Sequence, residues 1–229
     1  MKNPFRDLTR FEFGLWLSSV VVVALSYILS GAGDVLTVIS SLVGVTALIF
    51  VAKGYVIGQA LCLVFAVFYG IVSLFFGYYG EMITYLGMSA PASLMAVISW
   101  LRHPYKDSKT VEVSHVTKKQ LLFGVFLTAV TTVAFYFILS ALDTKNLVFS
   151  TLSVTTSIAA SYLTYLRSPW YAIAYSLNDV VLIVLWIFAT VEKVSYFPMI
   201  ICFIMFLLND LYGFYNWLRM RKNQNITEA

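Results

Sequence analysis

Long apolar segments recur along the whole chain, and they constrain its fold more than any other feature. Each is about 20 residues long, the length that an α-helix needs to cross a hydrocarbon core of about 30 Å. With 60% hydrophobic and only 11% charged residues, the chain lies far from soluble domains, in which about a quarter of residues are charged. The segments lack the alternation of barrel strands. The sequence therefore predicts an all-α integral membrane protein.

The pattern predicts eight transmembrane helices, over about residues 13–30, 35–52, 55–80, 82–101, 121–142, 146–166, 170–190 and 195–218. Alternate connections must then lie on the same side of the membrane, and the cytoplasmic set should carry the Lys and Arg residues. With the N-terminus inside, 13 of the 15 Lys and Arg fall on the cytoplasmic side, which leaves only Lys145 and Lys193 outside. This distribution favours eight spans with cytoplasmic N- and C-termini.

The eight segments divide into two triples. An N-terminal extra span (1–34) precedes a first three-helix unit (35–101), a cytoplasmic loop with a linker span (102–145), a second three-helix unit (146–218) and a basic cytoplasmic tail (219–229). Because a single linker span separates two odd-numbered units, the units must share one orientation, as parallel repeats do. Two short matches agree with this layout: Trp100-Leu101-Arg102 with Trp217-Leu218-Arg219, and Met82-Ile83 with Met199-Ile200.

The last segment carries a polar motif among Met, Ile, Phe and Leu residues. At helical spacing, Asn209, Tyr212 and Asn216 share one stripe, flanked by Asp210, Tyr215 and Trp217. Amides, phenols and an indole on adjacent faces suit a flat, hydrogen-bonding ligand. The alternative is interhelical packing, with Trp217 and Trp100 as aromatic residues of the membrane interface.

The seventh segment repeats this theme near the middle of the membrane. Tyr175, Asn178 and Trp186 line one stripe, and Asp179 lies at its edge. Asp179 and Asp210 are the only acidic residues inside the predicted segments, which contain no Lys or Arg. Each carboxyl must therefore use hydroxyl, amide or water partners, take up a proton, or meet a cationic ligand. A structural role for Asp179, such as capping a neighbouring helix, is the alternative.

The first triple has a milder polar set. Gln59 and Tyr69 share a face of the third segment with small residues, and Pro91 interrupts the fourth. This face suits helix packing as well as ligand contact.

Several chemistries find no support in the sequence. Cys62 and Cys202 lie inside apolar segments and are predicted to be buried thiols rather than a disulfide or metal pair. The sequence contains no phosphate-binding loop, no metal-ligand spacing and no nucleophilic triad. The basic loop and tail are explained by topology and anionic lipid, without nucleic acid. We therefore expect no enzyme activity, no cofactor and no metal.

With eight spans, two triples and Asn-Asp-x-Tyr-Gly-x-x-x-Trp in the last segment, the chain resembles the PnuC family of bacterial vitamin transporters. The resemblance implies a fold like that of the SWEET sugar transporters and a homotrimer in the bacterial inner membrane. It implies uptake of nicotinamide riboside by facilitated diffusion, with phosphorylation inside the cell trapping the substrate. Site roles follow only for Asn209 to Trp217 and for Asn178-Asp179.

Nicotinamide riboside is a flat pyridinium with an amide and a ribose, so it needs aromatic faces, amides and hydroxyls. The candidate residues supply these groups: Gln59, Tyr69, Tyr175, Asn178, Asp179, Trp186, Asn209, Asp210, Tyr212, Tyr215, Asn216 and Trp217. Thiamine, also a flat cation, or another vitamin is an alternative substrate. A scaffold or receptor subunit without transport is the alternative from another class. No ion coupling is expected, because neither aspartate has a charged partner in its segment.

Overall fold

The computed structural model describes residues 4–31, 35–75 and 79–228. This part of the chain is helical, and its only β-pairing consists of two isolated bridges, Tyr55 with Thr110 and Pro104 with Val111. The helices, in chain order, are η1 Pro4–Asp7, α1 Arg10–Ser30, α2 Val35–Ala52, α3 Val56–Phe75, α4 Tyr79–Thr84, the π-helical turn η2 Tyr85–Ser89, α5 Ala90–Arg102, α6 Lys118–Ala141, α7 Leu147–Tyr165, α8 Trp170–Glu192, η3 Val194–Tyr196 and α9 Phe197–Glu228.

Each predicted segment corresponds to a helix. Seven described helical segments are long and apolar enough to cross a membrane, with residues 82–102 counted as one, and α3 contributes a shorter apolar stretch. Their outer faces are apolar and exposed, as at Leu122 and Phe137 of α6. Surfaces of this kind are rare on soluble monomers and suit contact with lipid. The multi-pass helical architecture is confirmed.

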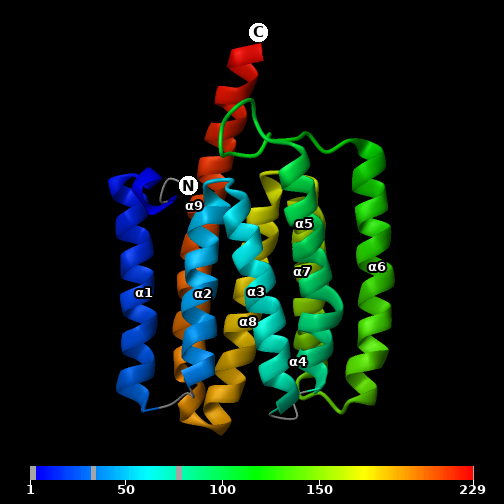
Figure 1. The fold of residues 1–229 in the computed structure, drawn as a ribbon. Helices are drawn as coiled ribbons and strands as arrows, with labels where there is room; N and C mark the ends of the chain where they lie inside the picture. Colours follow the sequence, from blue (N-terminus) through cyan, green and yellow to red (C-terminus); the bar gives the residue numbers. More distant parts are fainter. Residues whose placement is uncertain (1–3, 32–34, 76–78, 229) are drawn as a thin grey trace.

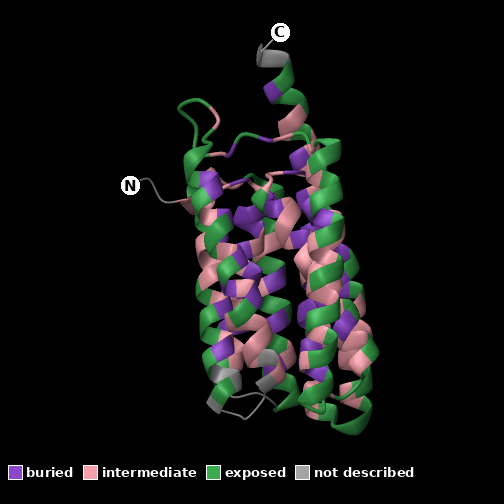
Figure 2. Cartoon of the chain, turned by 90° about the vertical axis from the view of Figure 1, so that its right-hand side faces the viewer, coloured by how far each residue is buried: buried purple, intermediate pink, exposed green. Residues whose placement is uncertain are grey.

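Six helical units pack into a closed ring. Around it, α2 contacts α3, α3 contacts α5, α5 contacts α7, α7 contacts α8, α8 contacts α9, and α9 returns to α2. Outside the ring, α1 packs on α2 and α9, and α6 packs on α7. Figure 1 shows the helices roughly side by side, with both chain termini at one end, which we call the terminal end. Buried residues concentrate on inward faces, and exposed residues face outward (Figure 2).

Local sequence signals explain where several helices begin and bend. Thr9 caps α1 and Thr117 caps α6, each in a reciprocal capping box with the residue three positions later. Gly31 ends α1 in the left-handed conformation that glycine adopts without strain. The π-helical turn Tyr85–Ser89 ends two residues before Pro91, where the missing N–H disturbs the regular ladder.

The loop over residues 103–117 folds back across the terminal end. Val111 N donates to Gly54 O at 2.9 Å, and Ser114 N donates to Arg167 O at 3.0 Å. The Gln224 side chain accepts from Val113 N and donates to Val111 O, so α9 holds the loop in place. Residues 219–228 contain no Gly or Pro, and α9 continues through them. The basic tail expected after residue 218 is thus helical.

Candidate functional site

Two carboxyl groups meet inside the ring, where α8 packs on α9. Asp179 of α8 is 3% exposed and Asp210 of α9 is 4% exposed. The side chains of the two residues interact with each other, and no N–H or O–H group of the described residues donates a hydrogen bond to Oδ2 of Asp179. The sequence identified these residues separately. The structure brings them together into one pair.

Side chains of α7 that carry hydroxyl groups form hydrogen bonds with two residues of α8. Oδ1 of Asn178 accepts hydrogen bonds from Thr156 Oγ1 at 2.8 Å and from Ser157 Oγ at 3.1 Å. The Tyr175 hydroxyl is hydrogen-bonded to Ser161 Oγ at 3.1 Å. Asn178 and Tyr175, two residues of the stripe predicted on the seventh segment, therefore face α7.

The α9 stripe turns away from the pair and toward α1. Asn209 Nδ2 donates to Ser19 Oγ at 3.0 Å. Tyr212 OH donates to Glu12 Oε1 at 2.9 Å. Asp210 points into the ring from the same helix. Neighbouring residues of the motif therefore lie on different faces of α9 and contact different parts of the bundle.

Glu12, in the first turn of α1, is a buried acidic residue that the sequence analysis did not select, because it placed the start of the first segment at residue 13. Its Oε2 accepts from Thr9 N at 2.6 Å and pairs with Lys53 Nζ at 2.8 Å. Both side chains are largely buried, at 3% and 13% exposure. The capping-box spacing from Thr9 to Glu12 was the available signal. Among the described residues, Glu12 is thus a third buried carboxyl beside Asp179 and Asp210, one residue before the predicted start of the first segment.

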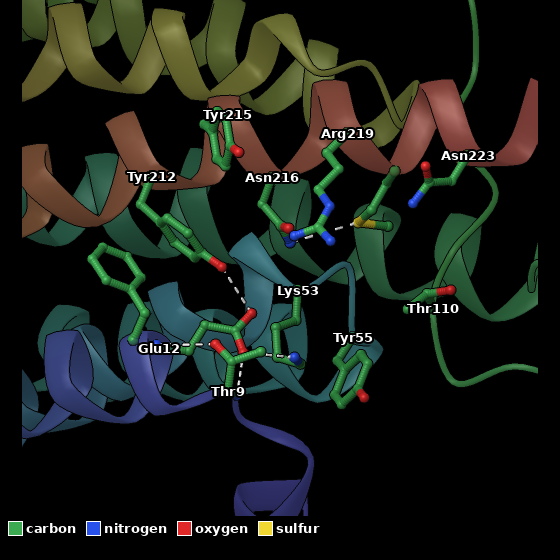
Figure 3. Close-up of a pocket in the computed structure, with 12 residues that line it drawn as sticks. Thr9, Glu12, Lys53, Tyr55, Thr110, Tyr212, Tyr215, Asn216, Arg219 and Asn223 are labelled. Carbon is green, nitrogen blue, oxygen red and sulfur yellow. Dashed lines mark hydrogen bonds and ion pairs between the residues drawn. The ribbon is translucent and has the colours of Figure 1, made fainter.

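A pocket of about 520 Å³ lies beside this ion pair at the terminal end. Figure 3 shows Glu12, Lys53, Tyr212, Asn216 and Arg219 around it. The predicted site residues Tyr212, Tyr215 and Asn216 line this pocket, whereas Asn178, Asp179 and Asp210 do not. Tyr212, Tyr215 and Asn216 thus lie beside this pocket, apart from the carboxyl pair in the interior of the ring.

Two tryptophans close the terminal end of the ring. Trp100 Nε1 donates to Thr164 O at 3.0 Å, and Trp217 Nε1 donates to Val51 O at 2.9 Å. Their ring centroids are 5.3 Å apart. Asn216 also bonds the end of α2, donating to Ala52 O at 2.9 Å. Both tryptophans are 0% exposed, so the interpretation as lipid-interface residues is wrong: each indole reaches inward because a buried backbone carbonyl accepts its N–H.

The remaining candidates lie elsewhere in the bundle. Gln59 of α3 is buried. Tyr69 packs against Tyr85 of the π-helical turn, with centroids 4.6 Å apart. Trp186 packs against Tyr196, with centroids 5.6 Å apart. Tyr171 lies on the stripe predicted with Tyr175, Asn178 and Trp186 but was not among the candidate site residues. Its buried hydroxyl has no hydrogen-bond partner among the described residues and lies near Asp210.

A multi-pass helical bundle with an acidic pair and amides in its interior has the architecture of a membrane transporter. Comparison with known proteins agrees. The model of the family described as "Nicotinamide mononucleotide transporter" matches residues 34–219. The chain therefore belongs to this family of membrane transporters, the PnuC family, and is not an enzyme.

Two relatives carry the name "Nicotinamide riboside transporter PnuC". The protein from Neisseria mucosa is 24% identical over 229 residues, covering 98% of this chain and 87% of the relative. The protein from Haemophilus influenzae is 24% identical over 213 residues, covering 92% and 91%. A crystal structure of "the Vitamin B3 transporter PnuC" superimposes with a TM-score of 0.77 at 24% identity, over 95% of this chain and 94% of that one. The fold is therefore shared.

Proposed function

We propose that the protein carries nicotinamide riboside across the bacterial inner membrane. The observation that carries this proposal is the Asp179–Asp210 pair in the interior of the ring. Acidic groups suit a pyridinium cation and oppose a phosphate, which needs Lys, Arg or aligned N–H donors. The predicted segments contain no Lys or Arg. This argues for the riboside named in the two relatives rather than the mononucleotide of the family description.

Within the candidate set, the interior residues are our proposed substrate contacts: Gln59, Tyr175, Asn178, Asp179 and Asp210. Tyr69 and Trp186 are proposed to flank the route farther from the terminal end. Asn216 and Trp217 are proposed to close the terminal end over the substrate, since both donate to carbonyls at the end of α2. We propose that Asn209, Tyr212 and Tyr215 do not touch the substrate. They act on its binding only by fixing the position of α9.

We also propose that the two triples are parallel repeats, as in the SWEET-like arrangement. Several contacts support an approximate two-fold relation. Trp217 bonds Val51 O of the first triple, and Trp100 bonds the matching Thr164 O of the second. The same two carbonyls accept from Gly54 N and Arg167 N, both at 2.9 Å. The carbonyl pair Val51 and Thr164 and the amide pair Gly54 and Arg167 share an offset of 113 residues, and the two tryptophans are 117 residues apart.

The proposed mechanism is facilitated diffusion without ion coupling, with phosphorylation inside the cell trapping the substrate. The terminal end is proposed to face the cytoplasm, in accord with the 13 Lys and Arg assigned to that side. A homotrimer is proposed from the family resemblance.

The test is calorimetry with nicotinamide riboside, nicotinamide mononucleotide and thiamine on the purified protein. We expect binding of the riboside in the micromolar range and no heat with the mononucleotide. Heat with thiamine alone would assign another vitamin. Reconstituted vesicles then decide between carrier and scaffold, because a scaffold moves no labelled riboside. Accumulation above equilibrium under an imposed proton gradient would contradict uncoupled transport.

A further inference from the structure

The acidic pair raises a question of charge that the proposed function leaves open. Ionised carboxylates only accept hydrogen bonds, so two of them in contact repel each other, and a bond between them requires a proton on one. Burial of two unpaired negative charges would add a large desolvation cost. Asp179 and Asp210 are buried and in contact. At least one proton must therefore reside on the pair.

No positively charged group of the described residues interacts with the pair. Among the described residues, the titratable groups that interact with it are the thiols of Cys62 on α3 and Cys202 on α9, and the phenols of Tyr171 and Tyr175 on α8. From α7, the Ser161 hydroxyl is hydrogen-bonded to Tyr175, and from α2, the Ser41 hydroxyl lies near the Cys202 thiol. All of these groups are uncharged at neutral pH and below. Any net charge in this interior is that of the two carboxyls.

Two unpartnered polar atoms mark the pair as a binding site rather than a closed structural contact. Within the part of the chain that the structure describes, Oδ2 of Asp179 accepts no hydrogen bond from an N–H or O–H group. The Tyr171 hydroxyl, on a side chain 1% exposed, also has no hydrogen-bond partner there. It lies against Gly213, one helical turn beyond Asp210, where an added Cβ would be 3.1 Å away. Buried polar atoms of this kind are costly unless a ligand engages them during the functional cycle.

We propose that Asp179 and Asp210 share a single proton, so that the pair presents one net negative charge and selects a flat monocation. The inference rests on the proposed function for the identity of that cation. The charge of the pair matches one pyridinium ring and disfavours both neutral and anionic analogues. Because the proton stays on the pair when the cation binds, charge selection requires no proton transport.

Asparagine substitutions separate the charge from the hydrogen bond. Asp179→Asn or Asp210→Asn leaves an amide that donates to the remaining carboxylate, which keeps one negative charge. The double variant D179N/D210N keeps two polar side chains of nearly the same shape but carries no charge. Asp107→Asn, in the exposed loop, is the matched control.

Infrared difference spectroscopy reports the proton without any ligand. The parent protein should show a protonated-carboxyl C=O band that shifts in deuterated water, and each single variant should lose it, while Asp107→Asn keeps it. No such band in the parent would overturn the shared proton. A band that survives in a single variant, showing that both carboxyls were protonated, would overturn it as well.

Calorimetry with nicotinamide riboside and with its uncharged dihydro form reports the charge. The single variants should weaken riboside binding a few-fold, and the double variant roughly 10- to 150-fold, the range for a contact to a charged group. The dihydro form should bind the parent more weakly than the riboside and be little affected by the double substitution. Equal losses in single and double variants would refute selection by charge.

If the double variant does not fold, riboside binding at acid pH tests selection by charge instead. Lowering the pH protonates the second carboxyl, so riboside affinity should fall while that of the dihydro form stays constant. The thiols and phenols around the pair are already protonated and do not change. A parent protein that binds neither compound would refute the proposed function, whereas the infrared band would still decide the shared proton.

Discussion

The Lys53–Glu12 ion pair provides the most direct test of how the first helix is attached to the ring. Lys53→Met removes the cation and leaves Glu12 only 3% exposed, with Tyr212 OH at 2.9 Å and Thr9 N at 2.6 Å as remaining donors. A buried carboxylate that loses its cation costs about 3–5 kcal/mol. The two remaining donors favour the lower end, about 3 kcal/mol. For a chain of this size we expect Tm to fall by roughly 6–12 °C.

The assay is thermal unfolding in one detergent at fixed protein concentration, followed by intrinsic tryptophan fluorescence. The double variant Glu12→Gln/Lys53→Met should recover most of the loss, because it removes the unpaired charge and keeps hydrogen-bonding groups for Tyr212 and Thr9. Lys145→Met is the control, since Lys145 and Glu192 form an exposed pair, at 78% and 58% exposure. Such pairs contribute little, so its Tm should not change.

Two results would refute the reasoning. An unchanged Tm for Lys53→Met would mean that Glu12 reaches water or takes up a proton at little cost. A double variant no more stable than Lys53→Met would mean that the lysine contributes by packing its methylene chain rather than by charge.

Three further variants probe packing at the terminal end. Gly58→Ala should lower stability by about 1–3 kcal/mol or prevent folding, because its Cβ would lie 2.4 Å from Val51 N. Gly14→Ala is the control in the same melting assay, since a Cβ there would have no described atom outside its own helix within 4 Å. Trp217→Phe removes the hydrogen bond to Val51 O and should lower stability by about 1–2 kcal/mol. Riboside affinity should change little, and a large loss of affinity would mean that the indole contacts the substrate. Gln224→Ala frees the loop from α9, so trypsin should cleave within residues 103–117 faster than in the parent, and equal rates would show that other contacts hold the loop.

The sequence alone determined the helical class, the segments and their order. A bilayer fixes the length of a spanning helix and satisfies no backbone group, so apolar runs of about 20 residues leave few alternatives. Helix boundaries agreed to within a few residues except at two places: α3 ends at Phe75 and residues 79–80 belong to α4, with 76–78 outside the described residues, and α9 runs on to Glu228. Within that extension Gln224 contacts the loop, which is more than 100 residues away in the chain.

The sequence analysis selected some residues of the candidate site and missed others. Sequence reasoning selected Asp179 and Asp210 because a carboxyl in an apolar segment is costly. That they meet in one pair depends on the packing of α8 on α9. Glu12 was missed because its capping role places it at a segment boundary, where Lys53, 41 residues away, supplies its counter-charge.

Only the tertiary structure decided which way each polar stripe faces. Asn209 and Tyr212 turn toward α1, while Asp210 on the same helix turns into the ring. In a soluble protein, the apolar face of a helix marks the core. In a membrane, lipid tails are as apolar as the leucines of the interior, so hydrophobicity does not distinguish the face toward protein from the face toward lipid. The direction of each stripe is therefore set by the helices that pack against it.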